Sequence, residues 1–211
     1  MSRPPSAQVP FTVLFVCTGN ICRSALAERL GRAYLNQLLG DDAADIRLMS
    51  AGTRAVVGSA MHPDTALVLR GFGADAGPFR ARHLIEFHAA EADLVLTMTR
   101  AHRDAVLRLA PRSLARTFTL REAAELLTLL GDDFEPDGLD LATRARALVK
   151  ALAEIRSWRT PHDADDVPDP IGRPLEAHDE AGGLIADALL PILSRLAAMA
   201  ATDSGARRWT M

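Results

Sequence analysis

The stretch that decides the fold is residues 12–25, Thr-Val-Leu-Phe-Val-Cys-Thr-Gly-Asn-Ile-Cys-Arg-Ser-Ala. An apolar, β-branched run ends at Cys17, and a helix-forming stretch begins after Arg23 and Ser24. The backbone N–H groups of a tight loop, together with the unpaired donors in the first turn of a helix, bind anions. A cysteine at such a position is favoured as the thiolate, the nucleophilic form. The stretch therefore predicts a strand, a phosphate-binding loop and a helix, with Cys17 as the nucleophile.

Three further residues of the loop fit this interpretation. Arg23 carries a planar guanidinium whose paired N–H groups match two oxygens of a phosphate. Gly19 and Asn20 are residue types that tolerate the left-handed backbone that such a loop requires. A nucleotide-binding P-loop is excluded, because the stretch lacks the Gly-Lys-Ser or Gly-Lys-Thr ending of that motif.

Residues 17–24 fill every defined position of the pattern Cys-x-Gly-Asn-x-Cys-Arg-Ser. They resemble the active-site signature of the low-molecular-weight protein tyrosine phosphatases. The resemblance implies that Cys17 is the nucleophile, that Arg23 binds phosphate and that Ser24 donates a hydrogen bond to the Cys17 thiolate. The remaining loop residues that it places around the phosphate are Thr18, Gly19, Asn20, Ile21 and Cys22. Ala25 departs from the proline that the family usually has.

Cys22 has two interpretations at this stage. The resemblance implies a reversible disulfide with Cys17, which protects the nucleophile from overoxidation. The alternative is a small, buried packing residue.

A second motif lies far downstream, at residues 166–172, Asp-Val-Pro-Asp-Pro-Ile-Gly. It resembles the loop that carries the general acid in the same family, and the matching residue is Asp169. A carboxylic acid can protonate the leaving oxygen of a phosphate ester, and Pro168 and Pro170 restrict the backbone on both sides of it. The competing interpretation is a solvated acidic turn, since Asp163, Asp165 and Asp166 crowd the same stretch.

The remaining candidate site residues follow from weaker matches. Ser50 begins a Ser-Ala-Gly-Thr stretch that lies beside the phosphate loop in the family, so we expect it to hydrogen-bond the loop or Asn20; an ordinary strand exit is the alternative. Val56 and Ile171 occupy positions where phosphotyrosine-directed members carry aromatic walls of the substrate slot. Ile21 favours phosphotyrosine, because phosphoarginine-directed relatives carry Thr at this position.

The chain alternates predicted strands and helices, which favours an α/β fold with a parallel sheet and helices on both faces. The strands are expected at 12–16, 46–49, 94–98 and 117–120. The helices are expected at 22–39, 63–71, after 98 as far as 107, at 121–130, 139–158 and 175–200. The resemblance implies a three-layer fold around a central parallel four-stranded sheet, with the phosphate loop between strand 1 and helix 1.

We expect one phosphatase-like domain at 11–201, between a flexible N-terminus at 1–10 and a flexible C-terminal tail at 202–211. A helical insert at about 121–160 is longer than the family pattern leads us to expect. Its amphipathic second helix is typical of a helix that is simply packed on the domain. A lid or a partner-docking element is the alternative, because the insert leads into the Asp169 loop.

Composition excludes several classes of protein. The chain has 211 residues and a net charge of −3, so it offers no basic surface for nucleic acid. We find no uninterrupted apolar run of about 20 residues and no signal peptide, and therefore expect no membrane contact. Both cysteines lie in the loop, which predicts a reducing, cytoplasmic setting.

The six histidines predict no metal site. His83 and His88 do not have a metal-ligand spacing, and the others stand alone in the sequence, namely His62, His102, His162 and His178. The resemblance likewise implies neither metal nor cofactor.

These patterns together predict a cysteine-dependent phosphatase that hydrolyses phosphomonoesters, with protein phosphotyrosine favoured, through a phosphocysteine intermediate. The partners expected are a phosphorylated protein or a small aryl phosphate. One alternative is an arsenate reductase that uses the same loop, although the chain has no cysteine after Cys22 to relay oxidation. The other is a catalytically weak phosphate-sensing or protein-docking module.

Overall fold

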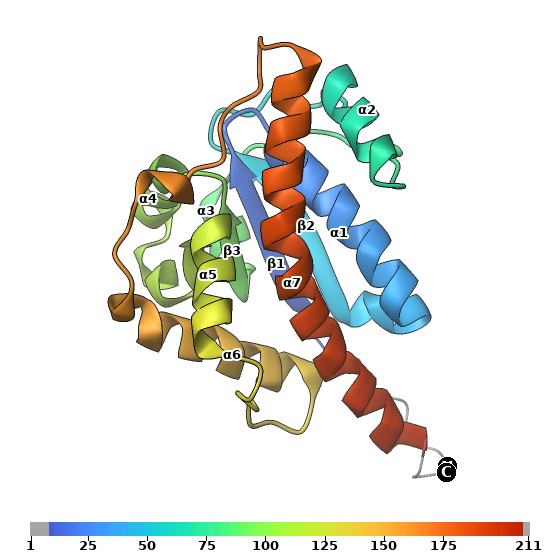
Figure 1. Ribbon diagram of the computed structural model, residues 1–211, viewed down its shortest axis with the longest axis vertical. Coiled ribbons are helices and arrows are strands. Elements are labelled where there is room, and N and C mark those ends of the chain that lie inside the picture. The colour runs from blue at the N-terminus through green and yellow to red at the C-terminus, as the bar shows by residue number, and fades with distance from the viewer. Residues whose placement is uncertain (1–8, 209–211) are drawn as a thin grey trace.

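The computed structural model describes the backbone of residues 9–208 and the side chains as far as Ala200. The strand β1 (Phe11–Cys17) lies inside its sheet, between two other strands. The sheet is parallel and has the order β2-β1-β3-β4 (Figure 1). The other strands are β2 (Ile46–Gly52), β3 (Leu94–Thr97) and β4 (Thr117–Thr119). Parallel neighbours need crossover connections, and helices supply them here. The predicted α/β fold with a four-stranded parallel sheet is confirmed.

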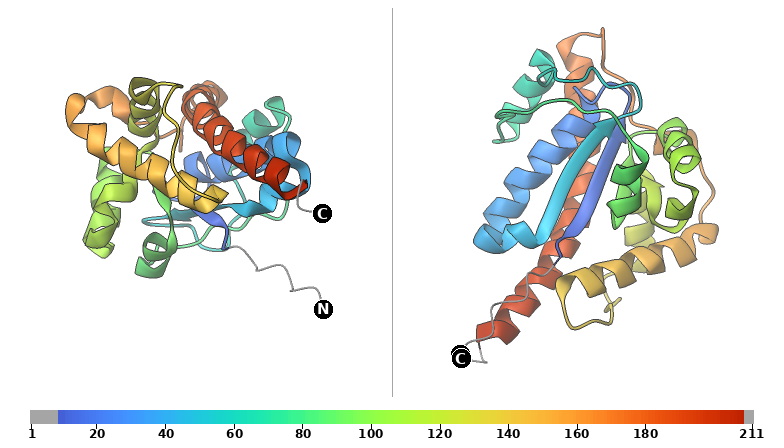
Figure 2. Two further views of the ribbon diagram at one scale, coloured as in Figure 1. Left: turned by 90° about the horizontal axis from the view of Figure 1, so that it is seen from below. Right: turned by 180° about the vertical axis from the view of Figure 1, so that it is seen from behind.

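The side chains of β1 divide between two hydrophobic cores, because successive side chains of a strand point to opposite faces. Phe11, Val13 and Phe15 join the larger core, whereas Leu14 and Val16 join the smaller one. The larger core includes side chains of α1 (Arg23–Leu39), α2 (Pro63–Gly71), α5 (Leu120–Leu130), α6 (Leu141–Ile155) and α7 (Leu175–Arg208). The smaller core includes side chains of α3 (Glu86–Glu91) and α4 (Arg100–Leu109). The sheet is therefore covered on both faces, as the three-layer prediction requires (Figure 2).

Several boundaries differ from the sequence prediction. The helix α3 was not predicted, because its six residues are too few to show a helical period. The strand β2 continues to Gly52, so Ser50 lies inside the strand and not after it. Short 3₁₀ turns, also not predicted, lie at Gly40–Asp45, Pro111–Arg116, Arg156–Trp158 and Asp163–Asp165.

The last helix, α7, is longer than predicted. It continues to Arg208, whereas the helix was predicted to end at residue 200, before the expected flexible tail at 202–211. The residues just before Thr202 are rich in alanine, which favours continuation of the helix, since each added residue contributes one further hydrogen bond. The expected flexible N-terminus falls largely on residues 1–8, which, like 209–211, lie outside the described residues.

Part of α7, Leu175–Ala200, is long and apolar enough to cross a membrane by length and composition, since an 18-residue window within it has a mean hydropathy of 1.6. No uninterrupted apolar run of this length occurs in the sequence, because Asp187 and Arg195 interrupt the apolar residues. In the structure, 56% of this window is buried inside the protein, where α7 packs on α1, α2 and α5. Leu189 and Leu193 are fully buried in the larger core. These contacts are those of a core helix.

The two helices of the predicted insert are present as α5 and α6. The helix α6 lies at the end of the sheet where the strands begin, away from the phosphate loop (Figure 1). Arg146 of α6 pairs there with Asp93, just before β3, with 2.7 Å between Nε and Oδ1. Because α6 lies at the opposite end of the sheet, it does not cover the phosphate loop. A partner-docking role of the insert stays a prediction.

Candidate active site

The phosphate loop connects Cys17, the last residue of β1, to α1, which begins at Arg23. Its outer side is covered by the segment that follows β2. Backbone N–H groups of this segment donate to the carbonyl oxygens of four loop residues. These bonds are Thr53 to Cys17 (2.9 Å), Arg54 to Thr18 (2.9 Å), Val56 to Gly19 (3.0 Å) and His62 to Ile21 (2.8 Å). Because successive carbonyl oxygens are held outward, the N–H groups of the loop are turned toward its centre, where they can bind an anion.

The close approach of β2 to the loop depends on Gly52. A Cβ atom at this position would lie 2.5 Å from the carbonyl oxygen of Thr18 and 3.0 Å from Cβ of Asn20. Only glycine gives the backbone this proximity without moving the loop. The glycine of the Ser-Ala-Gly-Thr stretch thus has a steric role that the sequence analysis did not identify.

Asn20 is held in the left-handed region, with φ of 53°, and is the only non-glycine residue in the described range 9–208 with a positive φ. Its side-chain amide donates to Ser24 Oγ (2.9 Å) and Ser50 Oγ (2.8 Å), and its Oδ1 accepts from the backbone N–H of Arg82 (2.8 Å). Ser50 donates in turn to Oε2 of the buried Glu28 at 2.6 Å. Every polar atom of the Asn20 side chain is thus used to fix the turn. Ser50 therefore hydrogen-bonds Asn20, as its resemblance implied.

The sulfur of Cys17 has two hydrogen-bond partners, Asn20 in the loop and Ser24 at the start of α1. Ser24 Oγ lies 2.9 Å from Cys17 Sγ, and the backbone N–H of Asn20 donates to the sulfur at 3.3 Å. Cys17 is 2% exposed. These contacts hold the sulfur at the centre of the loop, where it can act as a nucleophile.

Arg23 connects the phosphate loop to the downstream acidic loop. Its Nη1 donates to the carbonyl oxygen of Val167 at 2.9 Å, and its Nη2 lies 2.5 Å from Oδ2 of Asp169. Val167 is itself bound to the carboxyl end of β3, because its N–H donates to the carbonyl oxygen of Met98 at 2.8 Å. Asp169 is thereby placed beside the loop, with 42% of its side chain exposed.

The other acidic residues of this loop have structural partners. Asp166 accepts from the backbone N–H of Arg100 at the start of α4 (2.8 Å), and Asp163 pairs with the Arg100 side chain at 2.6 Å. The buried Asp165 pairs with Arg159. The competing interpretation, an acidic turn that is only solvated, does not fit these contacts.

A cavity of about 380 Å³ opens over the loop. It is lined by Cys17, Thr18, Gly19, Ile21, Cys22, Arg23, Arg54, Val56, Asp169 and Ile171. Val56 and Ile171 are each 49% exposed and, with Ile21, form the apolar part of the lining. No aromatic side chain of the described residues is among the lining residues. Arg54 was not predicted, although it directly follows the Ser-Ala-Gly-Thr stretch, and it adds positive charge at the rim.

His102 supports the loop from α4 and was also not predicted. Its Nε2 lies 2.9 Å from Thr18 Oγ1, and its Nδ1 lies 2.8 Å from Thr99 Oγ1. Burial, and then the nearby charge of Arg23, lower the pKa of His102 to about 4. The ring is therefore neutral near pH 7 and positions Thr18 through a hydrogen bond.

Cys22 differs from Cys17 in its surroundings. Both cysteines are free thiols, and burial raises the pKa of Cys22 to about 11. Its neighbours include His62 and His178, whose rings are stacked with centroids 4.7 Å apart. His62 and His178 stand alone in the sequence, but the packing of α2 against α7 brings them together.

We predict that Asn20→Ala weakens the binding of inorganic phosphate by about tenfold to a hundredfold. The substitution removes the three side-chain hydrogen bonds and strains the left-handed backbone. Asn20→Gly is the matched variant, because it loses the same hydrogen bonds but relieves the strain, and it should bind more tightly than Asn20→Ala. Isothermal titration calorimetry measures both affinities. Equal affinity of Asn20→Ala and the wild type would show that the turn does not organise the anion site.

Comparison with known proteins agrees with this geometry. Residues 12–131 match the family model described as "Low molecular weight phosphotyrosine protein phosphatase". A protein-arginine-phosphatase of Geobacillus stearothermophilus is 36% identical over 114 residues, which are 54% of this chain and 72% of the relative. A probable low molecular weight protein-tyrosine-phosphatase of Erwinia amylovora is 32% identical over 148 residues, which are 67% of this chain and 97% of the relative.

A solved structure of the same family has the same fold. The arginine phosphatase structure from Geobacillus stearothermophilus aligns with a TM-score of 0.61 at 28% identity, over 92% of this chain and 96% of that chain. The sequence match includes the loop from Cys17 to Ser24, and the fold match extends to most of the domain. The chain therefore belongs to the low molecular weight protein tyrosine phosphatase family, a family of metal-independent, cysteine-dependent hydrolases.

Proposed function

We propose that this protein hydrolyses phosphotyrosine in proteins, using Cys17 as nucleophile, Arg23 as phosphate ligand and Asp169 as general acid. The observation that carries the proposal is the convergence of these three side chains on one cavity, from the end of β1, the start of α1 and the downstream acidic loop. A nucleophile, an anion ligand and a proton donor are the three groups that such a reaction requires.

In the first step the thiolate of Cys17 attacks phosphorus on the side opposite the leaving oxygen. A sulfur–phosphorus bond forms as the oxygen–phosphorus bond breaks, and Asp169 gives its proton to the departing phenoxide. The loop N–H groups and Arg23 stabilise the charge on the three equatorial oxygens. The product of this step is a phosphocysteine and a free tyrosine side chain.

In the second step water attacks the phosphocysteine. Asp169, now a carboxylate, accepts a proton from the water, and the sulfur–phosphorus bond breaks to give inorganic phosphate and the Cys17 thiolate. The hydrogen bonds from Ser24 and Asn20 to the sulfur stabilise it as a leaving group. In both steps, the proposed proton transfers and charge stabilisation are carried out by side chains and backbone N–H groups of this protein.

The apolar lining supports an aromatic substrate. Ile21, Val56 and Ile171 present hydrocarbon surface beside Cys17, which suits a phenyl ring. A phosphorylated guanidinium has N–H groups that need acceptors, and Asp169 is the only carboxylate that lines the cavity in the described part of the chain. Because Asp169 already pairs with Arg23, phosphotyrosine fits this site better than phosphoarginine.

An arsenate reductase is not favoured. The matched relatives are named phosphatases, and the sequence has no cysteine beyond Cys22 to relay oxidation. The two free thiols support, as part of the proposal, a reducing cytoplasmic setting.

We predict that Asp169→Asn lowers kcat by about 10²–10⁴-fold, because the amide cannot protonate the leaving group. The loss should be smaller for an aryl phosphate that releases a strongly acidic phenol, which needs no proton from the enzyme. Steady-state hydrolysis of a series of aryl phosphates measures both effects.

The matched control is Asp163→Asn, which changes a carboxylate of the same stretch that pairs with Arg100 at the surface. It should keep kcat within about twofold, as surface ion pairs contribute little. A uniform loss with Asp169→Asn across all leaving groups would contradict the assignment of Asp169 as general acid.

We predict that the wild type has a higher kcat/KM for a phosphotyrosine peptide than for the same peptide with phosphoarginine. Ile21→Thr should shift this ratio toward phosphoarginine by about tenfold, since small changes in a pocket are worth about one to three kcal/mol. Val56→Thr makes the same kind of change on the other wall and should lower both activities alike. A wild type that prefers phosphoarginine would overturn the proposed substrate while leaving the mechanism in place.

A further inference from the structure

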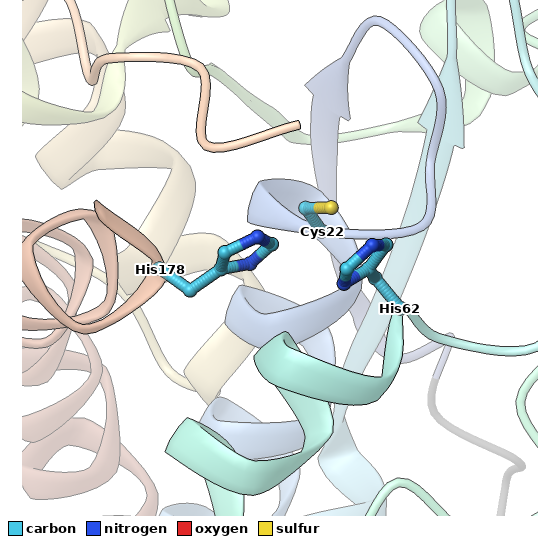
Figure 3. Close-up of side chains that lie close together, drawn as sticks. All are labelled: Cys22, His62 and His178. Atoms are coloured by element: carbon cyan, nitrogen blue, oxygen red, sulfur yellow. The ribbon is translucent and has the colours of Figure 1, made fainter. Parts of the chain in front are cut away.

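A thiol and two imidazoles meet beside the cavity, which Cys22 also lines, and the proposed reaction uses none of these three side chains. Cys22 comes from the phosphate loop, His62 from the residue before α2 and His178 from the first turns of α7 (Figure 3). Their ligand atoms, one from each side chain, all lie within 4.8 Å of one another. The two rings are nearly parallel, with an interplanar angle of 18°. Three distant segments therefore present soft and borderline metal ligands at one point.

One nitrogen of this cluster has no hydrogen-bond partner. His178 is 1% exposed; its Nδ1 lies 2.8 Å from Thr65 Oγ1, but its Nε2 is buried and unpaired. An unpaired buried polar atom is destabilising, and a ligand bound at this nitrogen would remove the penalty. Asp64 Oδ2 lies 4.0 Å from this nitrogen and 3.9 Å from Nδ1 of His62, beyond hydrogen-bond distance from both.

We propose that Cys22, His62 and His178 bind one divalent zinc-type cation, and that the cation reversibly inhibits the enzyme. On binding, the Cys22 thiol releases its proton to solvent and its sulfur forms a bond to the metal, while each ring donates a nitrogen lone pair. No fourth Cys, His, Asp or Glu of the described residues lies within the same distance of all three ligand atoms, so water takes the fourth position. Thiolate and imidazole ligands in a four-coordinate site are of the kind that Zn²⁺ takes in proteins.

The described residues contain a second group of potential metal ligands, Glu125, His162 and Asp165, but this group is not free to bind a metal ion. The guanidinium of Arg159 lies among them and donates to both carboxylates. That group already holds a cation, and its acceptors are satisfied. The cluster at Cys22 contains no such charge, and one of its atoms remains unpaired.

Inhibition follows from the position of Cys22, and this part of the inference rests on the proposed function. Ligand atoms on one tetrahedral Zn²⁺ lie about 3.3–3.8 Å apart, given bond lengths of roughly 2.0–2.3 Å. The three side chains, whose ligand atoms lie within 4.8 Å of one another, must therefore close by up to about 1.5 Å. Cys22 belongs to the loop that binds phosphate, and a displacement of this size in a catalytic site costs about a hundredfold in rate. Metal removal by a chelator should restore the activity.

The metal site is tested with Co²⁺ as a spectroscopic probe, on a Cys17→Ser background that removes the nucleophile as a competing ligand. We expect one equivalent of Co²⁺ to give tetrahedral visible bands and a thiolate-to-metal charge-transfer band, both displaced by Zn²⁺. Cys22→Ser should abolish the charge-transfer band. His178→Gln should weaken Zn²⁺ binding by more than about tenfold, and His162→Gln, the matched control in the other group, should not change it.

Two results would overturn the metal site: no Co²⁺ bands in the folded Cys17→Ser protein, or bands that persist unchanged in Cys22→Ser and His178→Gln. His62→Gln replaces His178→Gln if circular dichroism shows that the latter is unfolded. Inhibition is tested with Cys17 intact, with each rate compared with that of the same variant in chelator. We expect about hundredfold inhibition that His178→Gln relieves, and equal inhibition of both proteins would overturn the regulatory part. Bands without any phosphatase activity would contradict the proposed function alone.

Discussion

The left-handed turn at Asn20 is the constraint on which the rest of the site depends. Its backbone conformation reverses the chain between β1 and α1, so that the loop's N–H groups converge on one point beside the Cys17 sulfur. This conformation is costly for a residue with a side chain, and it persists because the Asn20 amide is bound to Ser24, Ser50 and Arg82. The end of β2 closes the arrangement, because Gly52 lets its backbone lie directly against the loop. The anion site is therefore a product of strand pairing as much as of the loop itself.

Arg23 connects the phosphate loop, the rigid part of the site, to the more exposed loop that carries Asp169. It is buried at the start of α1, yet it contacts both the backbone at Val167 and the carboxylate of Asp169. The loop that carries Asp169 is in turn anchored to β3 through Met98 and to α4 through Asp166. The nucleophile and the acid thus reach one cavity from segments about 150 residues apart, and the sheet and its helices set the separation between them.

The sequence was sufficient for the parts of the fold and site that depend on local chemistry. The alternation of apolar strands and amphipathic helices predicts the parallel sheet, and the Cys17 to Ser24 loop and Asp169 were predicted with it. The contributions of Glu28, Arg82 and His102 arise only from tertiary packing, since nothing local distinguishes these residues from ordinary surface ones. The pairing of His62 with His178 depends in the same way on the contact of α2 with α7. The end of α7 was predicted too early, because the helix continues to Arg208 through residues of low helix propensity such as Thr202, Asp203 and Gly205.

The central claim is that phosphate passes through the sulfur of Cys17. The direct measurement is to mix the enzyme with a radiolabelled aryl phosphate, stop the reaction with denaturant within one turnover, and map the labelled peptide. The account predicts label on the peptide that contains Cys17, bound to that residue and absent in Cys17→Ser. Product formation without a labelled peptide, or label on another residue such as Cys22 or His102, would contradict it.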